Sequence, residues 1–277
     1  MHIKEKLTTF CKTLNEHATK RLFDVENIEI VECGYKKGHT PPESGWQPLQ
    51  PICGEHRHHW LRFSFHTPKA EAGSEYLLRC NTGLNGWDAN NPQGLLYLNG
   101  KMVQGLDTNH TDAFLEPDTQ YDALVYLYTG TVKRPFPFDI NVQQRYTDVF
   151  GLYYDIITPL EALEYLNENT TEYRQILTHL ERAVNLVDTR VPHSEDFFAS
   201  VAAAREFLKT EFYEGVCTPE GKPVVHCIGH THIDVEWLWH RAQTREKMQR
   251  SFATANALME KYPKIGKSTR LNSSHTP

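Results

Sequence analysis

The stretch VVHCIGHTHIDVEWLW, residues 224–239, decides how this sequence is interpreted. It begins with an apolar run that ends at Gly229. Three side chains of metal-binding type follow at alternating positions: His230, His232 and Asp234. In an extended chain these would share one face, and imidazole and carboxylate groups are ordinary ligands of a divalent metal such as zinc. The stretch therefore predicts a buried strand with a metal site at its carboxyl end, where α/β folds build their sites.

Two tryptophans, Trp237 and Trp239, follow closely. The ring of Trp237 could pack against the apolar side of a sugar or fill part of the core. Beyond them, apolar residues at helical spacing predict a long helix with an apolar stripe on one face. The stripe consists of Met248, Phe252, Ala255 and Met259. A strand-type run over residues 224–228, a loop and this helix are together how an α/β domain begins.

The chain before this stretch changes character several times. Residues 1–46 predict one or two amphipathic helices within about the first thirty residues, followed by a loop rich in Gly, Pro and Lys. The helical spacing is carried by Ile3, Leu7, Phe10 and Leu14. Residues 47–150 hold short β-type runs closed by turn residues, which predicts an ancillary antiparallel β sandwich. Within it, Asn99-Gly100 suits a type I′ hairpin turn.

Residues 151–218 predict a helical connector. Ser194 is expected to cap the second of its helices, because a hydroxyl can accept from the free backbone N–H groups of the first turn. The two apolar stripes consist of Ile176, Leu180, Ala183 and Val187, and of Val201, Ala204 and Leu208. Residues 219–263 then begin the α/β part, and residues 264–277 are polar and unpatterned.

Composition and charge exclude some classes of protein. The net charge of the 277-residue chain is −6 and its isoelectric point lies near 6.2, so no basic excess supports binding to nucleic acid. No apolar run approaches the ~20 residues that span a bilayer, and the charged N-terminus lacks the apolar core of a signal peptide. The six cysteines show no Cys-x-x-Cys spacing. We expect free thiols and a cytoplasmic protein with no membrane or nucleic-acid partner.

Other residues that attract notice are interpreted as structural. The His-rich run at residues 56–59 is expected to form a solvated surface. The tryptophans of the β segment are expected to pack within it and not to stack on sugars: Trp46, Trp60 and Trp87. Asp107 and Glu116 are expected to be turn or surface groups, not catalytic carboxylates.

The stretch GHTHIDVEWLWHRAQTREKMQRSF, residues 229–252, resembles the opening of the catalytic domain of glycoside hydrolase family 38, the retaining, metal-dependent α-mannosidases. It is similar to that family's signature in the spacing of its glycine, histidines, aspartate and tryptophans, and in the helix that follows. Upstream, NGKMVQGLDTNHTD at residues 99–112 resembles the N-terminal β domain of the cytosolic and bacterial branch. The resemblance covers roughly residues 40–263 and is strongest at 228–250.

The resemblance implies a multi-domain fold: a β-sandwich-like domain, a helical connector, and then the first strand and helix of a seven-stranded α/β barrel. His232 and Asp234 match two ligands of one divalent metal ion, expected to be zinc. Trp237 matches the aromatic residue beside the bound mannose. His230 matches a position that is not a ligand, so a supporting role behind the ligands is expected. In such enzymes one carboxylate forms a glycosyl-enzyme and a second carboxylic acid protonates the leaving oxygen.

The resemblance also points to parts that this sequence does not supply. Family members are much longer, and this chain ends at Pro277. We therefore expect an N-terminal fragment without a catalytic residue of its own, whose nucleophile and remaining metal ligands lie elsewhere, and which is inactive alone. Residues 264–277 resemble translated adaptor sequence and are expected to be a foreign tail. The expected substrate is a mannose-containing oligosaccharide, and the full-length form is expected to be a homo-oligomer.

Two other functions fit parts of the sequence. A metal-dependent amidohydrolase also begins an α/β barrel with His-x-His, in which case His230 and His232 would both be ligands and Asp234 would be secondary. The tryptophan pair and the preceding β domain fit that class poorly. The second alternative is not an enzyme: residues 47–150 could form a carbohydrate-binding module, if its tryptophans were open to sugars.

Overall fold

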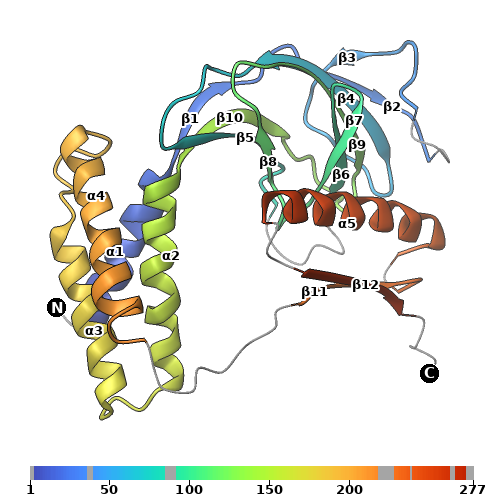
Figure 1. Ribbon diagram of the computed structural model, residues 1–277. Coiled ribbons are helices and arrows are strands. Elements are labelled where there is room, and N and C mark those ends of the chain that lie inside the picture. Colours follow the sequence, from blue (N-terminus) through green and yellow to red (C-terminus); the bar gives the residue numbers. More distant parts are fainter. Residues whose placement is uncertain are drawn as a thin grey trace. The chain divides into compact units, whose positions relative to one another are not determined.

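The computed structural model of this protein describes residues 3–35, 40–84, 92–217, 228–237, 239–262 and 266–272. The chain divides into two compact units, a helical unit and a β unit (Figure 1). The helical unit comprises residues 1–21, 70–75 and 144–224, and the β unit comprises residues 22–69, 76–143 and 225–277. In the described part of the chain, no helix combines the length and the apolar character needed to cross a membrane.

Two sheets make up most of the β unit. The six-stranded sheet has the order β3 (Gln47–Pro48), β2 (Glu29–Glu32), β4 (His58–His66), β9 (Gln120–Tyr128), β6 (Gln93–Leu98), β7 (Lys101–Leu106). The four-stranded sheet has the order β1 (Thr19–Asp24), β10 (Asp139–Tyr146), β5 (Ser74–Asn81), β8 (Asp112–Leu115). Buried apolar side chains of both sheets pack into one core, among them Leu61 and Phe63 of β4 and Leu78 of β5. The short strands predicted within residues 47–150 are therefore confirmed.

Alternate side chains of β4 point to opposite faces of the six-stranded sheet and lie in two different apolar clusters. Leu61, Phe63 and Phe65 face the core between the sheets. Trp60 faces the other side of the six-stranded sheet, where it lies in a second, smaller apolar cluster with Tyr126. Because both faces of this part of the sheet are covered, β4 begins with four consecutive buried residues and loses the alternation that a half-exposed strand would show.

The predicted hairpin turn at Asn99-Gly100 is confirmed. It joins β6 to β7, and both of its residues have positive φ, 49° at Asn99 and 77° at Gly100. A type I′ turn requires positive φ at both central positions, which Asn and Gly adopt at least cost. This turn sets the pairing of β6 with β7, the strand on which the last helix of the chain rests.

The N-terminal segment differs from the prediction. The predicted helix is observed only as α1 (Ile3–Ala18), and the next residues form β1 and β2. The prediction of helix and loop throughout residues 1–46 was therefore wrong for these two strands. Leu22, Phe23 and Ile30 pack against the core of the sandwich, so their burial depends on strand partners far away in the sequence.

The helical unit contains four long helices and two short ones within the described residues. They are α1, α2 (Thr147–Ala162), η2 (Leu163–Tyr165), α3 (Thr171–Leu186), α4 (Glu195–Phe207) and the π-helical η3 (Leu208–Tyr213). Ser194 caps α4 as predicted, and its side chain accepts from the backbone N–H of Phe197. The predicted stripe of Val201, Ala204 and Leu208 is buried in the core of this unit.

The last described elements are β11 (Ile228–Asp234), α5 (Arg241–Lys261) and β12 (Gly266–Asn272). The two strands pair in parallel, with Ile228 opposite Gly266 and Asp234 opposite Asn272. A parallel strand–helix–strand order is the repeating unit of α/β folds, and the seven-stranded barrel stays a prediction. Residues 224–227 of the predicted strand lie outside the described residues. Residues 264–277, expected to be unpatterned, contain β12.

Candidate functional site

His232 and Asp234 lie together at the end of β11. The Nε2 atom of His232 is 2.9 Å from the Oδ1 atom of Asp234, a hydrogen-bonding distance. Because the two residues are two positions apart in a strand, their side chains project to the same side. The alternation in the sequence thus predicted this juxtaposition, while the role of the two groups as metal ligands stays a prediction.

The donor chemistry of this pair fits part of a metal site. An imidazole nitrogen and a carboxylate oxygen are both ordinary zinc ligands, and both converge on one point at the strand end. A structural zinc site needs four such groups, and a catalytic site needs three and an open position. Among the side chains that the structure describes, no group of three or more His, Cys, Asp or Glu residues is placed to hold a metal ion. The side chain of His230 lies outside the described residues.

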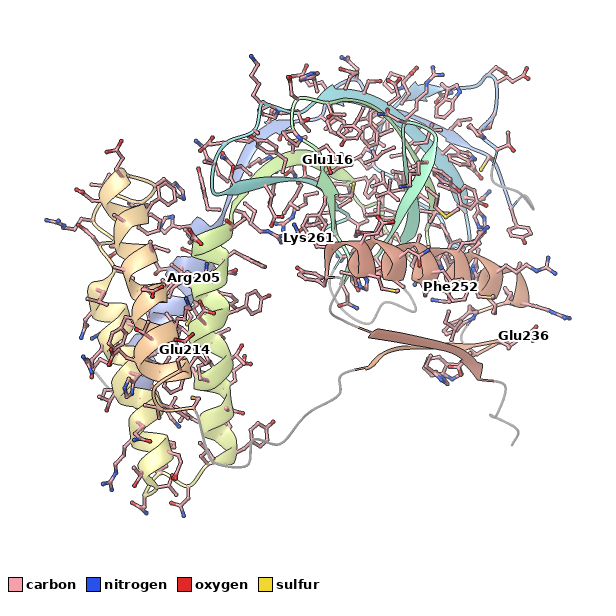
Figure 2. The ribbon with its side chains drawn as sticks, in the orientation of Figure 1. Glu116, Arg205, Glu214, Glu236, Phe252 and Lys261 are labelled. Carbon is pink, nitrogen blue, oxygen red and sulfur yellow. The ribbon has the colours of Figure 1, made fainter. Side chains whose placement is uncertain are left out.

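Trp237 lies on the loop that joins β11 to α5, beside Glu236, which Figure 2 labels on that loop. Its side chain is exposed, at 54%. Its ring meets the ring of Trp239 edge to face, with 5.7 Å between centroids. The loop that follows Asp234 therefore presents a partly exposed aromatic ring to solvent.

Thr244 fastens this loop to the first turn of α5. The indole N–H of Trp239 donates to the Thr244 hydroxyl at 3.2 Å, and that hydroxyl donates to the carbonyl oxygen of Val235. At the helix start, the backbone N–H of His240 donates to the side-chain oxygen of Gln243 at 3.2 Å. The ammonium group of Lys247 lies over the Trp239 ring, 4.2 Å from its centroid. The loop beside His232 and Asp234 is thus held by side chains of α5.

The opposite side of α5 rests on the six-stranded sheet through buried polar residues. Glu246 is 2% exposed and His58 is 6% exposed. The Nε2 atom of His58 lies 3.1 Å from Oε1 of Glu246, and the hydroxyl of Tyr126 donates to the same oxygen at 3.3 Å. Arg250, one turn further along α5, is also buried and donates to the side-chain oxygen of Gln93 on β6. We call these five residues, His58, Gln93, Tyr126, Glu246 and Arg250, the polar seam.

The polar seam corrects one expectation from the sequence. His58 and His59 were expected on a solvated surface and are both buried, so only His56 and Arg57 of that run are exposed. Burial lowers the pKa of His59, since a low-dielectric environment disfavours the charged imidazole. The burial of His58 could not be predicted from the sequence, because Glu246, the residue of α5 that it contacts, is 188 positions away.

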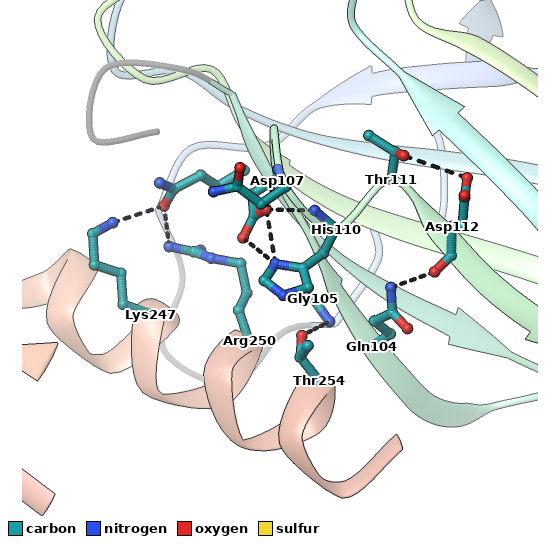
Figure 3. A network of polar contacts seen from close by, with 11 residues as sticks. Gln104, Gly105, Asp107, His110, Thr111, Asp112, Lys247, Arg250 and Thr254 are labelled. Carbon is teal, nitrogen blue, oxygen red and sulfur yellow. Dashed lines mark hydrogen bonds and ion pairs between the residues drawn. The ribbon is translucent and has the colours of Figure 1, made fainter. Parts of the chain in front are cut away.

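Backbone atoms approach closely where α5 crosses β7 (Figure 3). The backbone N–H of Gly105 donates to the hydroxyl of Thr254 at 3.1 Å. A Cβ atom at Gly105 would lie 2.7 Å from Cβ of Arg250 and 2.9 Å from its carbonyl oxygen. Figure 3 also shows Lys247 and Arg250 reaching from α5 to one side-chain oxygen on the sheet, that of Gln93. Glycine at position 105 therefore lets the helix approach the sheet.

The apolar stripe predicted for this helix is not the face that meets the sheet. At about 100° per residue, Phe252 and Met259 lie on the side of α5 opposite Arg250. Met259 is exposed, whereas the residues buried under the helix are mostly polar. The helix thus has an apolar face and a buried polar face, and the periodicity of the sequence indicates only the apolar one. The polar face could not be recognised, because its partners on β4, β6 and β9 are distant in the sequence.

The remaining candidates are structural, as expected where they are described. Trp60 is 2% exposed, and the ring of Trp46 lies under the guanidinium of Arg62 at 4.4 Å; Trp87 lies outside the described residues. Asp107 accepts from two backbone N–H groups of its own turn and from the ring of His110. Burial alone would raise the pKa of Asp107, but these hydrogen bonds and the nearby imidazole lower it below its usual value. Glu116 is an exposed residue of the β8–β9 turn.

Residues 222–267 match the family described as glycosyl hydrolases family 38 N-terminal domain. This segment contains β11, the loop with Trp237, and α5. The match therefore falls on the part of the chain that carries the candidate site.

Curated proteins with similar sequences are α-mannosidases. Alpha-mannosidase 2C1 of Homo sapiens is 29% identical over 229 residues, covering 74% of this chain and 20% of the human protein. Alpha-mannosidase 2C1 of Mus musculus is 34% identical over 113 residues, which are 41% of this chain and 10% of the mouse protein. Alpha-mannosidase G of Dictyostelium discoideum is 41% identical over 60 residues, 22% of this chain and 5% of that protein.

These matches differ in how much they cover. The chain spans about one fifth of the length of the human relative, and the similarity to that relative extends well upstream of the family segment. The segment of residues 222–267, which holds the His232–Asp234 pair, therefore matches the N-terminal domain of glycosyl hydrolases family 38, in a chain that is similar to alpha-mannosidase 2C1 of human and mouse.

Proposed function

We propose that this chain carries the first part of the active site of a retaining, metal-dependent α-mannosidase that removes terminal α-mannose from oligosaccharides. The observation that supports it most is the His232–Asp234 pair, which meets at the end of a strand within the family 38 segment. The exposed ring of Trp237 on the following loop adds an apolar surface for a sugar. The protein is proposed to act in the cytoplasm, because residues 99–112 resemble the cytosolic and bacterial branch of that family.

In this proposal each residue has a separate task. The imidazole of His232 and the carboxylate of Asp234 provide two ligands for one divalent metal ion, with zinc as the expected metal. A metal bound there would act as a Lewis acid on the hydroxyls of the reacting sugar. Trp237 packs against the apolar face of the mannose and orients it. His230 supports the ligands from behind, a role whose geometry lies outside the described side chains.

We further propose that residues 1–277 alone do not turn over substrate. A retaining glycosidase needs two carboxyl groups about 5 Å apart, one on each side of the scissile bond. Asp107 is engaged in its own turn, and Glu116 lies in the β8–β9 turn, so neither is a candidate for that pair. The nucleophile, the acid and the remaining ligands would come from residues not present in this chain.

Two other functions are less well supported. The carbohydrate-binding alternative needs exposed tryptophans in or beside residues 47–150, but of the two described there Trp60 is buried and the Trp46 ring is packed under Arg62. The amidohydrolase alternative makes Asp234 dispensable for metal binding, whereas the sequence matches are to α-mannosidases.

A segment exchange tests the function. Residues 222–263 of this chain replace the matching segment of Dictyostelium alpha-mannosidase G, and hydrolysis of an aryl α-mannoside is measured. The exchanged enzyme should retain activity, and Asp234→Asn should lower kcat/KM by about 100-fold or more. Glu236→Gln, an exposed carboxylate two residues away, serves as the matched control and should have little effect.

Two results would count against the proposal. One is an Asp234→Asn enzyme that is as active as the Glu236→Gln control, which is the outcome the amidohydrolase alternative predicts for a dispensable aspartate. The other is turnover of the aryl α-mannoside by residues 1–277 alone.

A further inference from the structure

The polar seam is a costly way to attach a helix to a sheet. Glu246, His58 and Arg250 are all nearly inaccessible to water, and desolvation of such groups is compensated only when their geometry and partners are right. Ala253, on the same face of α5, shows that an apolar contact with Trp60 and Tyr126 is available there. An apolar face can slide along a sheet with little change in energy, whereas paired polar groups fix one register.

The pairing in the seam specifies both the position and the rotation of α5. Glu246 is held from two strands at once, since His58 lies on β4 and Tyr126 on β9. One turn later, Arg250 reaches a third strand through Gln93 of β6. A helix anchored at two successive turns to three strands cannot rotate or shift without breaking these contacts.

The same helix holds the loop of the candidate site from its other side. Thr244, two residues before Glu246, contacts both Val235 and Trp239 through its hydroxyl. Val235 directly follows Asp234, and Trp237 lies between the two contact points. The sheet and the loop are therefore linked in series through one helix. Glu246 contacts β4 and β9, and Thr244, two residues earlier on α5, contacts the residues on either side of Trp237.

We propose that His58 and Glu246 are positioning residues: the six-stranded sheet holds α5 in one register and thereby sets the loop of Trp237 and the end of β11. The sheet then helps to shape the site, although its strands contribute no group to it. That the positioned side chains bind metal and sugar rests on the proposed function. The positioning itself does not, and its test uses neither metal nor substrate.

The test follows the environment of Trp237 in the whole 277-residue chain. The protein is prepared with 5-fluorotryptophan, and the ¹⁹F resonance of Trp237 is assigned from the Trp237→Phe variant. Glu246→Ala breaks the seam, and Thr244→Val breaks the link between α5 and the loop without touching the seam. Glu260→Ala is the matched control, because Glu260 is an exposed glutamate on the same helix.

The proposal predicts that the Trp237 resonance moves by more than its line width in Glu246→Ala and in Thr244→Val, and stays in place in Glu260→Ala. The double variant Glu246→Ala/Thr244→Val should move it no further than the larger single change, because both act along one series of contacts. Glu246→Gln retains the volume and the acceptor for Tyr126, and should restore most of the wild-type position.

A purely stabilising role for the seam predicts something else. The melting temperature would then fall in Glu246→Ala while the Trp237 resonance stays unchanged, or the effects of Glu246→Ala and Thr244→Val would add. Either result overturns the proposal. If Glu246→Ala does not fold, His58→Leu takes its place, because it removes the imidazole that Glu246 contacts. An unmoved Trp237 resonance in that variant is then the contradicting outcome.

Discussion

His232 and Asp234 show what residue types and spacing can establish without a structure. The period of two along a strand brings their side chains within hydrogen-bonding distance, and the alternation His-x-Asp is visible in the sequence. His58 shows the opposite case. Nothing in the run His-Arg-His-His indicates burial, because the glutamate that it contacts lies on a helix near the other end of the sequence. The contacts of a side chain could be predicted where its partner is near in the sequence, and not where they depend on tertiary packing.

Asp107 allows a prediction at the same scale. Its pKa in the folded protein lies below the ordinary value of 3.8, so the ionised carboxylate stabilises the fold above that pH, and this contribution is lost as the pH falls through the folded pKa. Asp107→Ala should lower the free energy of unfolding by about 1 kcal/mol near neutral pH. Urea unfolding between pH 7 and pH 3 measures the difference from wild type.

Glu116→Ala is the control for this experiment, since Glu116 is an exposed carboxylate of a neighbouring turn. The difference between wild type and Asp107→Ala should become smaller toward pH 3, whereas Glu116→Ala should stay close to wild type throughout. A constant difference for Asp107→Ala over the whole range would show that the carboxylate charge does not matter in this turn.

Among the elements, those set by local sequence were predicted and those set by distant partners were not. The Asn99-Gly100 turn and the Ser194 cap depend on residues within a few positions, and both are observed. The sequence predicts helix or loop where β1 and β2 are observed. These strands are stabilised by pairing within the sheets, which the local sequence does not indicate. For α5, periodicity predicts the helix and its apolar stripe, but it gives no sign that the residues buried under the helix are mostly polar.

The close contact of α5 with β7 gives a prediction at the scale of the element. Gly105→Ala places a methyl group against Cβ and the carbonyl oxygen of Arg250, which are near the helix axis and cannot rotate away. The helix should be pushed off the sheet, at a cost of about 1–3 kcal/mol in the free energy of unfolding. Amide hydrogen exchange in α5 should become faster, as seen by mass spectrometry.

Gly94→Ala is the matched control for Gly105→Ala. Its Cβ would meet Cγ1 of Val125 at 3.1 Å, on the side of the sheet that faces the core of the sandwich. This variant should also be less stable than wild type, but amide hydrogen exchange in α5 should increase less than exchange in the strands around Gly94. Equal effects of the two variants on α5 exchange would contradict the assignment of Gly105 as the point of approach.

At the scale of the whole molecule, the chain combines a helical unit with a β unit that includes a parallel strand–helix–strand segment. The family 38 match falls on this segment, and the human relative is about five times longer than the region that it shares with this chain. In the proposed function His232 and Asp234 would give two of the ligands that a metal site needs, so that activity requires further residues. The strand, the helix after it and the meeting of His232 with Asp234 could be predicted from the motif, whereas the contact that anchors α5 to the six-stranded sheet required the structure.

The central claim is that His232 and Asp234 bind a divalent metal in a family 38 active site. Anomalous scattering at the zinc edge, from crystals of the alpha-mannosidase that carries residues 222–263 of this chain, tests it most directly. We predict one peak at about 2.0–2.2 Å from an imidazole nitrogen of His232 and from a carboxylate oxygen of Asp234, which Asp234→Asn weakens or removes. A metal bound without either residue, or an active enzyme with no metal at this position, would contradict the account.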